Sequence, residues 1–335
     1  MFIFKKISNN IIYKMEQLKK DILDSRNLKP RSIQAYIFNL EKLHDKMFGN
    51  KNITSLEYLK DTKKVMDIID DLKLSTRKTY LASIVVALST QEKKYEKQLK
   101  IYREEMMDLI GKSKDEAEKQ EKTPTQSENW TTMAELKKVI KKYKKDLQDR
   151  GTFKKNKENI NSREKALLQK WMVGSLYVLD DKHPPLRNDF TPMKIISYKQ
   201  YIDLTDEQKG ENNYLVIQSR NKKFFSLGEY KTSQTYGVKR IDLTSKLNSV
   251  INIYQKYNDG DYLIYNSKNQ PMTPNGLTKY LNKIFEPSGK NNISSTMLRH
   301  IYISEKFGGP TLKEKKEVAE KMGHSVSTQE IYKKQ

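Results

Sequence analysis

The sequence predicts a mainly α-helical protein with a small antiparallel β-sheet, an α+β chain of two domains. Three observations lead to this prediction. Apolar residues recur every three or four positions in both halves of the chain, which is a helical period. Between residues 214 and 244 the pattern changes to short segments rich in β-branched and aromatic residues. A polar stretch at 112–128, almost free of large apolar residues, separates the halves and predicts a linker.

The first domain is expected at 15–111, after a loose N-terminal arm at 1–14. Its segment "PRSIQAYIFNLEKLHDKMFG" begins at Pro30, a residue favoured at helix N-termini, and ends at Gly49. The later segment "TRKTYLASIVVALSTQEKKY" has Ser75 just before it as the expected N-cap. With "MEQLKKDILDSRN" and "TSLEYLKDTKKVMDIIDDLK", these segments predict roughly four or five helices.

The second domain is expected at 129–335. It opens with two amphipathic helical segments, "WTTMAELKKVIKKYKKDL" and "NSREKALLQKWMVGSLYVL", and Ser162 is the expected cap of the second. The segments "NYLVIQS", "KKFFSLG" and "VKRIDLT" predict strands, and the loop "EYKTSQTYG" joins the last two. After residue 244 the helical period returns and continues to the C-terminal end of the sequence.

Composition favours a polyanionic partner. The 335 residues include 64 Lys and Arg against 42 Asp and Glu, a formal net charge of +22. Such a balance favours nucleic acid, because neutralising phosphates releases counterions, and an anionic membrane surface is the competing partner. No apolar run approaches the roughly 18 residues of a membrane span. We therefore expect a soluble, intracellular protein that does not bind membranes.

Cofactor and metal chemistry have little support in the sequence. There is no cysteine, which excludes disulfides and thiolate zinc sites. The four histidines are scattered and show no metal-ligand spacing. We expect neither a cofactor nor a bound metal.

A group of residues suited to chemistry lies near the C-terminal end, in "KMGHSVSTQEIYKK". Gly323 stands where a helix C-terminus favours a left-handed residue. Ser327 followed by Glu330 has the spacing of a capping box, so a short helix is expected to start there. His324 would then lie in the turn between two helices, and Tyr332 in the second turn of the last helix.

Two arginines and a lysine complete the candidate site. Arg299 and His300 lie within the apolar helix "TMLRHIYISEKF", where an arginine needs a partner if it is buried, and a phosphate suits it. Arg187 follows two prolines in "PPLRNDF", which fix the local backbone. Lys231 lies in the loop between the two predicted strands, where Lys222, Lys223 and Lys239 are nearby alternatives.

These segments resemble the boxes of a known family. From about Trp130 to the end, the chain resembles the catalytic domain of tyrosine recombinases of the phage-integrase type. "PPLRNDF", "YKTSQTYGVKRIDL", "LRHIYIS" and "MGHSVSTQEIYKK" are similar, in that order, to its first arginine box, lysine hairpin, second arginine box and histidine–tyrosine box. The helical first domain is similar to the family's core-binding domain, which clamps DNA. The "PPLRND" form is most similar to integrases of large DNA viruses, virophages and related mobile elements.

The resemblance implies a site-specific DNA recombinase or integrase that needs no metal and no ATP. Tyr332 would attack a DNA phosphodiester and form a 3′-phosphotyrosine link. Arg187 and Arg299 would hold the non-bridging oxygens, and Lys231 would protonate the leaving 5′ oxygen. His324 would hydrogen-bond the phosphate or the nucleophile. The implied partner is double-stranded DNA, with self-association into a tetramer on synapsed sites.

Further residues are expected to contact DNA. Arg77 and Lys78 begin an N-terminal helix and are candidates for DNA contacts, although a solvated first helical turn explains them as well. His300 is expected to be a structural residue or a secondary phosphate contact. Its side chain lies about 100° from that of Arg299 around the helix, so it stays open whether His300 replaces the histidine that the family has three residues before that arginine.

The chain also departs from the family pattern. Thr296 stands where the family has a histidine three residues before the second arginine, and the interval from His324 to Tyr332 is one residue shorter than the commonest form. Few residues follow the tyrosine, so protomers would need another docking contact. Two alternatives therefore stay open, a type IB topoisomerase and a DNA-binding accessory protein with weakened activity. A polybasic membrane or RNA binder would explain the charge but not the ordered boxes.

Overall fold

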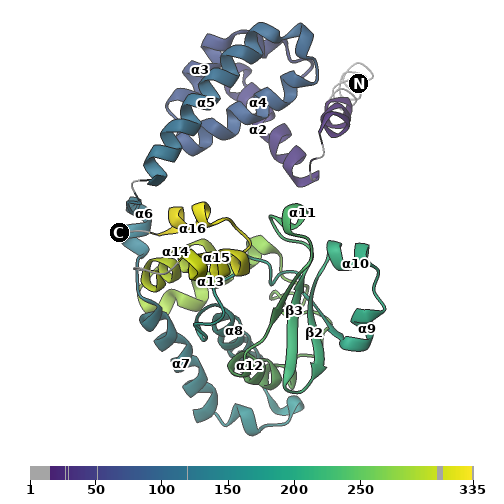
Figure 1. The fold of residues 1–335 in the computed structure, drawn as a ribbon, viewed down its shortest axis with the longest axis vertical. Helices are drawn as coiled ribbons and strands as arrows, with labels where there is room; N and C mark the ends of the chain where they lie inside the picture. The colour runs from purple at the N-terminus through teal and green to yellow at the C-terminus, as the bar shows by residue number, and fades with distance from the viewer. Residues whose placement is uncertain are drawn as a thin grey trace. The chain divides into compact units, whose positions relative to one another are not determined.

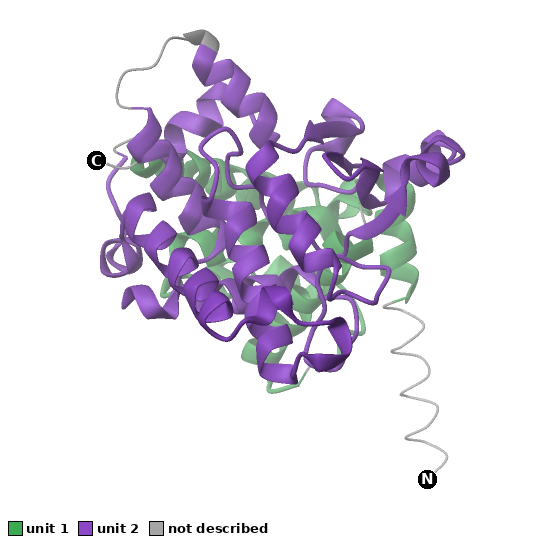
Figure 2. Cartoon of the chain, turned by 90° about the horizontal axis from the view of Figure 1, so that it is seen from below, with its two compact units in different colours: residues 1–119 green, residues 120–335 purple. Residues whose placement is uncertain are grey.

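The computed structural model describes residues 16–26, 28, 30–50, 52–118, 120–307 and 312–333. The chain divides into two compact units, residues 1–119 and 120–335 (Figure 2). The division falls inside the stretch 112–128 that was expected to be a linker. The expected arm at 1–14 lies outside the described residues.

Helices occupy much of the expected linker. Helix α5 continues to Glu118, since the charged residues at its end are good helix formers. Helix α6 (Pro124–Asn129) begins at a capping box in which Thr123 and Gln126 bond to each other's backbone N–H. The non-helical part of the stretch is therefore shorter than its polar composition suggests.

Unit 1 is helical, as the sequence predicts. Helix α2 packs on α4, and α4 packs on α5, around a core that includes Leu40, Leu81 and Tyr102. Helix α4 begins one residue before Ser75, so Ser75 is not its N-cap; Lys73 holds that position without a side-chain bond. Residues 16–25 are helical, and the other elements of this unit are α2 (Pro30–Phe48), η1 (Glu57–Lys60), α3 (Thr62–Asp70), α4 (Leu74–Ser89), η2 (Glu92–Lys94) and α5 (Glu96–Glu118).

Unit 2 combines helices with one sheet (Figure 1). Helix α8 begins at Ser162, but its cap is Asn161, which forms a capping box with Glu164. After α6, the helices of this unit are α7 (Met133–Asp149), η3 (Thr152–Lys154), η4 (Lys157–Asn159), α8 (Ser162–Val178), α9 (Tyr198–Ile202), α10 (Asp206–Glu211), α11 (Ser233–Tyr236), α12 (Ser245–Gln255), α13 (Pro274–Phe285), η5 (Glu286–Ser288), α14 (Ser295–Lys306), α15 (Leu312–Met322) and α16 (Val326–Tyr332).

The sheet has four strands in the order β1-β2-β3-β4. The predicted antiparallel pairing is confirmed for β2 (Asn213–Ser219), β3 (Lys222–Leu227) and β4 (Lys239–Asp242). An additional edge strand, β1 (Lys194–Ser197), pairs in parallel with β2, so the sheet is mixed. Parallel pairing is possible because the connection from β1 to β2 crosses over through α9 and α10 (Figure 1).

Side chains alternate between the two faces of the sheet along each strand, and both faces are covered. Leu215 and Phe225 face the main core of unit 2, while Val216 and Phe224 belong to a smaller cluster that Tyr201 of α9 helps to cover. The sheet is therefore packed on both faces, and the β3–β4 connection, which contains α11, extends beyond the strands (Figure 1).

Helix α14 is enclosed by the unit. Seven consecutive residues, 297–303, are all buried, so the helix has no solvent face over these two turns. Any polar side chain in this stretch is held inside the protein. Across the described part of the chain, no helix combines the length and the apolar character required to cross a membrane.

Candidate active site

Arg299 is the centre of the candidate site. Its side chain is fully buried in α14. Its Nη1 donates at 3.4 Å to the carbonyl oxygens of Pro185 and Met322, whereas Nε and Nη2 have no hydrogen-bond partner. Burial lowers the pKa of Arg299 to about 10, so the side chain keeps its charge at neutral pH. The result is a buried cation with two sets of unused donors.

Arg187 reaches the same place from another segment. It follows Pro184 and Pro185, and its own carbonyl oxygen accepts a hydrogen bond of 2.9 Å from the Tyr177 hydroxyl. Its Nη1 lies 3.4 Å from the carbonyl oxygen of Gly323. A stiff turn and a buried hydroxyl thus hold Arg187 beside the end of α15.

The two arginines have a half-buried acidic neighbour. Asp189 lies two residues after Arg187, and burial raises the pKa of its carboxyl group, although the charges of Arg187 and Arg299 oppose that shift.

The end of α15 places His324. Gly323 has a φ of +68°, its N–H bonds to Glu320, and the N–H of His324 bonds to Ala319 at 3.0 Å. This pattern is a Schellman motif, and the left-handed residue predicted at 323 is confirmed. The turn directs the chain from α15 straight into α16, with His324 between them.

His324 is buried and neutral at physiological pH. Burial and the charges of Arg299 and Arg187 lower its pKa to about 4. Its Nδ1 lies 3.0 Å from the carbonyl oxygen of Ser325, so Nδ1 carries the proton there, while Nε2 is buried without a partner. The free lone pair on Nε2 can accept a proton or a hydrogen bond.

Tyr332 lies among these residues at the end of α16. The helix begins at Val326, and the hydroxyl of its N-cap, Ser325, accepts from the N–H of Thr328. The predicted capping box at Ser327 and Glu330 is therefore wrong, because the helix starts earlier. The Tyr332 ring centroid is 5.4 Å from that of His324.

Neighbouring guanidinium groups make the Tyr332 hydroxyl more acidic. The charge of Arg299, whose guanidinium carbon lies 4.8 Å from the ring centroid, acts together with that of Arg187. Burial alone would raise the pKa of Tyr332, but the two arginines lower it below its usual value. The residue is thus a candidate nucleophile by its environment as well as by its motif.

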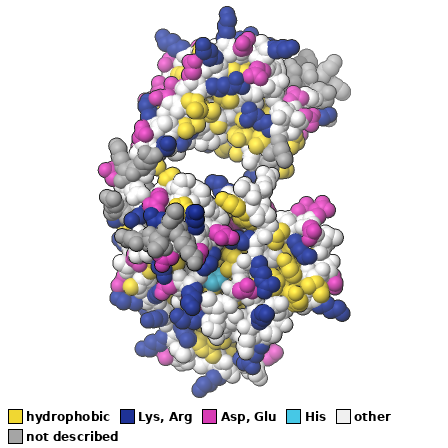
Figure 3. Space-filling model, viewed as in Figure 1, with side chains coloured by type: hydrophobic (Ala, Val, Ile, Leu, Met, Phe, Trp, Pro, Cys, Tyr) yellow, Lys and Arg dark blue, Asp and Glu magenta, His cyan; other side chains and the backbone are white. Residues whose placement is uncertain are grey.

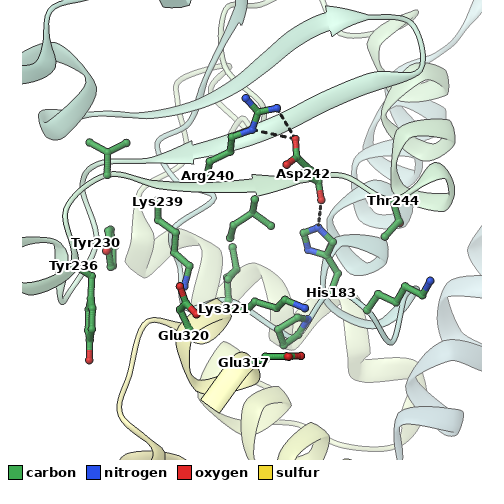
Figure 4. A pocket seen from close by; sticks show the side chains of 15 residues that line it. His183, Tyr230, Tyr236, Lys239, Arg240, Asp242, Thr244, Glu317, Glu320 and Lys321 are labelled. Carbon is green, nitrogen blue, oxygen red and sulfur yellow. Dashed lines mark hydrogen bonds and ion pairs between the residues drawn. The ribbon is translucent and has the colours of Figure 1, made fainter. Parts of the chain in front are cut away.

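Lys231, the lysine expected from the motif, and its alternative Lys239 lie in different environments. Lys231 is exposed in the β3–β4 connection. Lys239, the first residue of β4, is partly buried, and burial lowers its pKa to about 8, helped by the charges of Arg299 and Arg187 and opposed by Glu320. In Figure 4, Lys239 extends from β4 toward Glu320, along the wall of a pocket of about 620 Å³. Lys239 therefore shares the electrostatic environment of the two arginines.

The β3–β4 connection is tied to the histidine turn. The Thr232 hydroxyl donates to the carbonyl oxygen of Gly323 at 2.7 Å, and the Tyr230 hydroxyl donates to that of Gly237 at 2.8 Å. Lys231, between these two residues, is thus close in sequence to an anchored point while its side chain faces solvent.

The residues predicted to contact DNA have other partners. In unit 1, Arg77 pairs with Asp70 at 2.6 Å and with Glu105 at 3.1 Å, and Lys78 donates to the Ser113 hydroxyl at 2.7 Å. These contacts fit the structural explanation of both residues, and a DNA contact remains a prediction.

Two other positions of α14, His300 and Thr296, differ in burial. His300 is buried, and its ring lies 4.9 Å from the ring of Tyr332, whereas Thr296 is exposed. Both Arg299 and His300 contact Tyr332, although they point in different directions around α14.

A metal ion in the site would require a cluster of metal-ligating side chains. Among the described residues, no group of three or more His, Cys, Asp or Glu side chains is placed to hold a metal ion. The candidate site is instead a cluster of cations around one phenol.

Comparisons with known proteins yield structural neighbours only. No family model matches the sequence, and no curated protein does. A crystal structure of XerA recombinase aligns with 95% of this chain and 92% of its own, at 10% identity and a TM-score of 0.38. A structure of XerH site-specific recombinase bound to a palindromic difH substrate, a post-cleavage complex, aligns with 95% of this chain and 80% of its own, at 16% identity and a TM-score of 0.49. The XerH pre-cleavage complex with difH aligns with 95% of this chain and 81% of its own, at 16% identity and a TM-score of 0.48. Similarity at this level assigns neither an activity nor a role to any residue.

Proposed function

We propose that this chain cleaves and rejoins duplex DNA through a 3′-phosphotyrosine intermediate, as a site-specific recombinase or integrase. One observation carries the proposal: Nε and Nη2 of Arg299 and Nε2 of His324 are buried without a hydrogen-bond partner, and both side chains contact the ring of Tyr332. A buried polar group left unpaired costs about 1–3 kcal/mol, so its retention indicates a ligand. A phosphodiester has the charge and the geometry that a guanidinium group matches with two hydrogen bonds.

The nucleophile in this mechanism is the Tyr332 hydroxyl. Its oxygen attacks the phosphorus, and its proton moves to Nε2 of His324, which has a free lone pair. The lowered pKa of Tyr332 favours loss of the proton, whereas the pKa of about 4 at His324 makes its Nε2 a weak base that must act as the P–O bond forms. Arg299 and Arg187 then stabilise the negative charge that develops on the non-bridging oxygens.

We assign the proton donor for the leaving group to Lys239 in place of Lys231. A general acid works best when its pKa is near the operating pH, and the pKa of Lys239 is about 8. Its ammonium group gives a proton to the 5′ oxygen as the P–O bond breaks. The phosphotyrosine link retains the bond energy, so a 5′ hydroxyl can reverse the step without ATP.

Charge over both units supports a DNA partner. Lys and Arg side chains are distributed over the visible surface of each unit (Figure 3), in keeping with the formal net charge of +22. Phosphate contacts of this kind give strong, salt-sensitive binding. Recombination of a mobile element or virus by a tetramer on synapsed sites is the context that the sequence motifs suggest.

The test is covalent capture. The full-length protein is incubated with nicked duplexes taken from the DNA that flanks its gene. After cleavage, the short fragment that carries the new 5′ hydroxyl diffuses away, so the adduct accumulates. A denaturing gel that shows a protein–DNA adduct, mapped by mass spectrometry to Tyr332, supports the proposal. DNA binding without any adduct would indicate the accessory protein instead. Adducts on unrelated DNA, together with relaxation of supercoiled plasmid, would indicate a type IB topoisomerase.

A further inference from the structure

His300 contacts the main chain of the candidate nucleophile. Its Nδ1 lies 2.8 Å from the carbonyl oxygen of Tyr332, and the two rings meet edge to face with centroids 4.9 Å apart. Only 8% of His300 is exposed. A buried imidazole thus touches both the backbone and the ring of one residue.

The chemistry of the contact fixes the direction of the hydrogen bond. A carbonyl oxygen only accepts, so Nδ1 must carry a proton and donate it. The last carbonyl groups of a helix have no partner within the helix, and Tyr332 is the last residue of α16. His300 therefore acts as a side-chain cap for the C-terminal end of α16.

This cap is important because α16 is short. A helix of 7 residues is far below the length at which isolated helices persist, so its place depends on contacts with the rest of unit 2. Two other contacts act at Glu330: Nε2 of Gln120 donates to its carbonyl oxygen at 2.6 Å, and Nζ of Lys315 pairs with its carboxylate at 2.6 Å. The contact from His300 reaches residue 332 itself.

We propose that His300 is a positioning residue that holds the backbone of Tyr332, and so aims its hydroxyl between Arg299 and His324. This role rests on the proposed function, and it differs from the DNA or phosphate contact that the sequence suggested for His300. Because the hydrogen bond goes to the main chain, it persists whether or not the hydroxyl has reacted. His300 then affects how the tyrosine attacks the phosphorus, and it does not assist the departure of the 5′ oxygen.

The expected effect concerns rate rather than DNA affinity. A displacement of about 1 Å in a reacting group can cost about 100-fold in rate. His300→Leu keeps much of the side-chain volume and removes the donor, so it should slow adduct formation at saturating DNA by about that factor. His300→Asn places an amide N–H near the position of Nδ1 and should recover much of the rate. His300→Gln places its amide near Nε2 and should recover less.

A matched control exists in unit 1. Nδ1 of His44 also lies 2.8 Å from a main-chain carbonyl oxygen, that of Asn50. His44→Leu removes a bond of the same kind far along the chain from the site and should leave the rate at saturating DNA unchanged.

A substrate with sulfur in place of the 5′ bridging oxygen separates the two sides of the reaction. The thiolate leaves without a proton, so this substrate should restore activity to Lys239→Ala. His300→Leu should stay slow on it, since its defect lies in the attack. Equal rescue of both variants would overturn the proposal and place His300 on the side of the leaving group.

Hydrogen exchange gives a readout that does not depend on any reaction. Amides in residues 326–332 should exchange faster in His300→Leu than in wild type, and His300→Asn should restore protection. Unchanged exchange in α16 would overturn the positioning role even if the enzyme is active. Conversely, the exchange in α16 could be faster in His300→Leu while the wild-type protein forms no adduct. That result would support His300 as an anchor of α16 and reject the proposed function.

Discussion

The guanidinium group of Arg299 lies over the ring of Tyr332, with its carbon 4.8 Å from the ring centroid. Because Arg299 is fully buried and two of its nitrogens lack partners, the same cation serves two purposes. Its charge makes the phenol more acidic, and its unused donors provide a place for an anion. In the proposed mechanism, activation of the nucleophile and binding of the phosphate are therefore linked through one side chain.

Tyr332→Phe should abolish the covalent adduct and preserve DNA binding. The substitution keeps the ring that packs against Arg299 and His324 and removes only the attacking oxygen. Loss of one hydroxyl should change the free energy of unfolding by about 1 kcal/mol or less. The checks are a denaturing gel for the adduct and a gel shift for binding. An adduct that persists would place the nucleophile on another residue.

Inorganic sulfate should stabilise the wild-type protein through Arg299. The unpaired Nε and Nη2 groups gain an acceptor when an anion binds, and a ligand at 100 times its Kd adds about 2.7 kcal/mol. Sulfate also stabilises proteins generally, so the measurement is the difference in Tm shift between wild type and Arg299→Met at equal ionic strength. Equal shifts in the two proteins would show that no anion binds there.

Much of the fold follows from periodic patterns in the sequence. The helices of unit 1 and the three antiparallel strands have long or clear patterns, and these patterns predict them. Strand β1 escapes prediction because "KIIS" is too short to show alternation and pairs with a strand beyond two intervening helices. The predicted caps at Ser75, Ser162 and Ser327 fail because neighbouring residues offer competing starts, and the helix boundary then moves by one or two positions.

The candidate site is predictable only where a motif fixes the residue. The boxes around Arg187, Arg299, His324 and Tyr332 select residues that the structure brings together. The lysine cannot be chosen in the same way, since the choice depends on the register of the β3–β4 hairpin, in which Lys239 pairs with Leu227. The contact of His300 with Tyr332 is equally invisible in the sequence, because it requires the burial of α14 on all sides.

Lys239→Ala should impair adduct formation far more than Lys231→Ala. Loss of a general acid costs about 100- to 10,000-fold in rate, whereas Lys231 is exposed, so its removal should have a small effect. Both variants lose one positive charge, which makes Lys231→Ala a matched control for DNA affinity. Single-turnover rates at saturating DNA are the measurement. A larger loss in Lys231→Ala would return the role of proton donor to Lys231.

The pH dependence should reveal the same lysine. The pKa of Lys239 lies at about 8, below the ordinary value of 10.5, so its acid form is present below that pH and is lost as the pH rises through it. The rate of adduct formation at subsaturating DNA, which reflects the free enzyme, should therefore fall above about pH 8.

Groups on the nucleophile side have the opposite effect on rate. The pKa of His324 is about 4, so its Nε2 stays unprotonated throughout the neutral range, and the lowered pKa of Tyr332 favours attack as the pH rises. Neither group explains a loss of rate in alkali. On a substrate with a bridging sulfur as leaving group, the fall above pH 8 should disappear, since the thiolate needs no proton. If the fall persists on that substrate while DNA affinity is constant across the same pH range, another group limits the reaction, and Lys239 is not the acid.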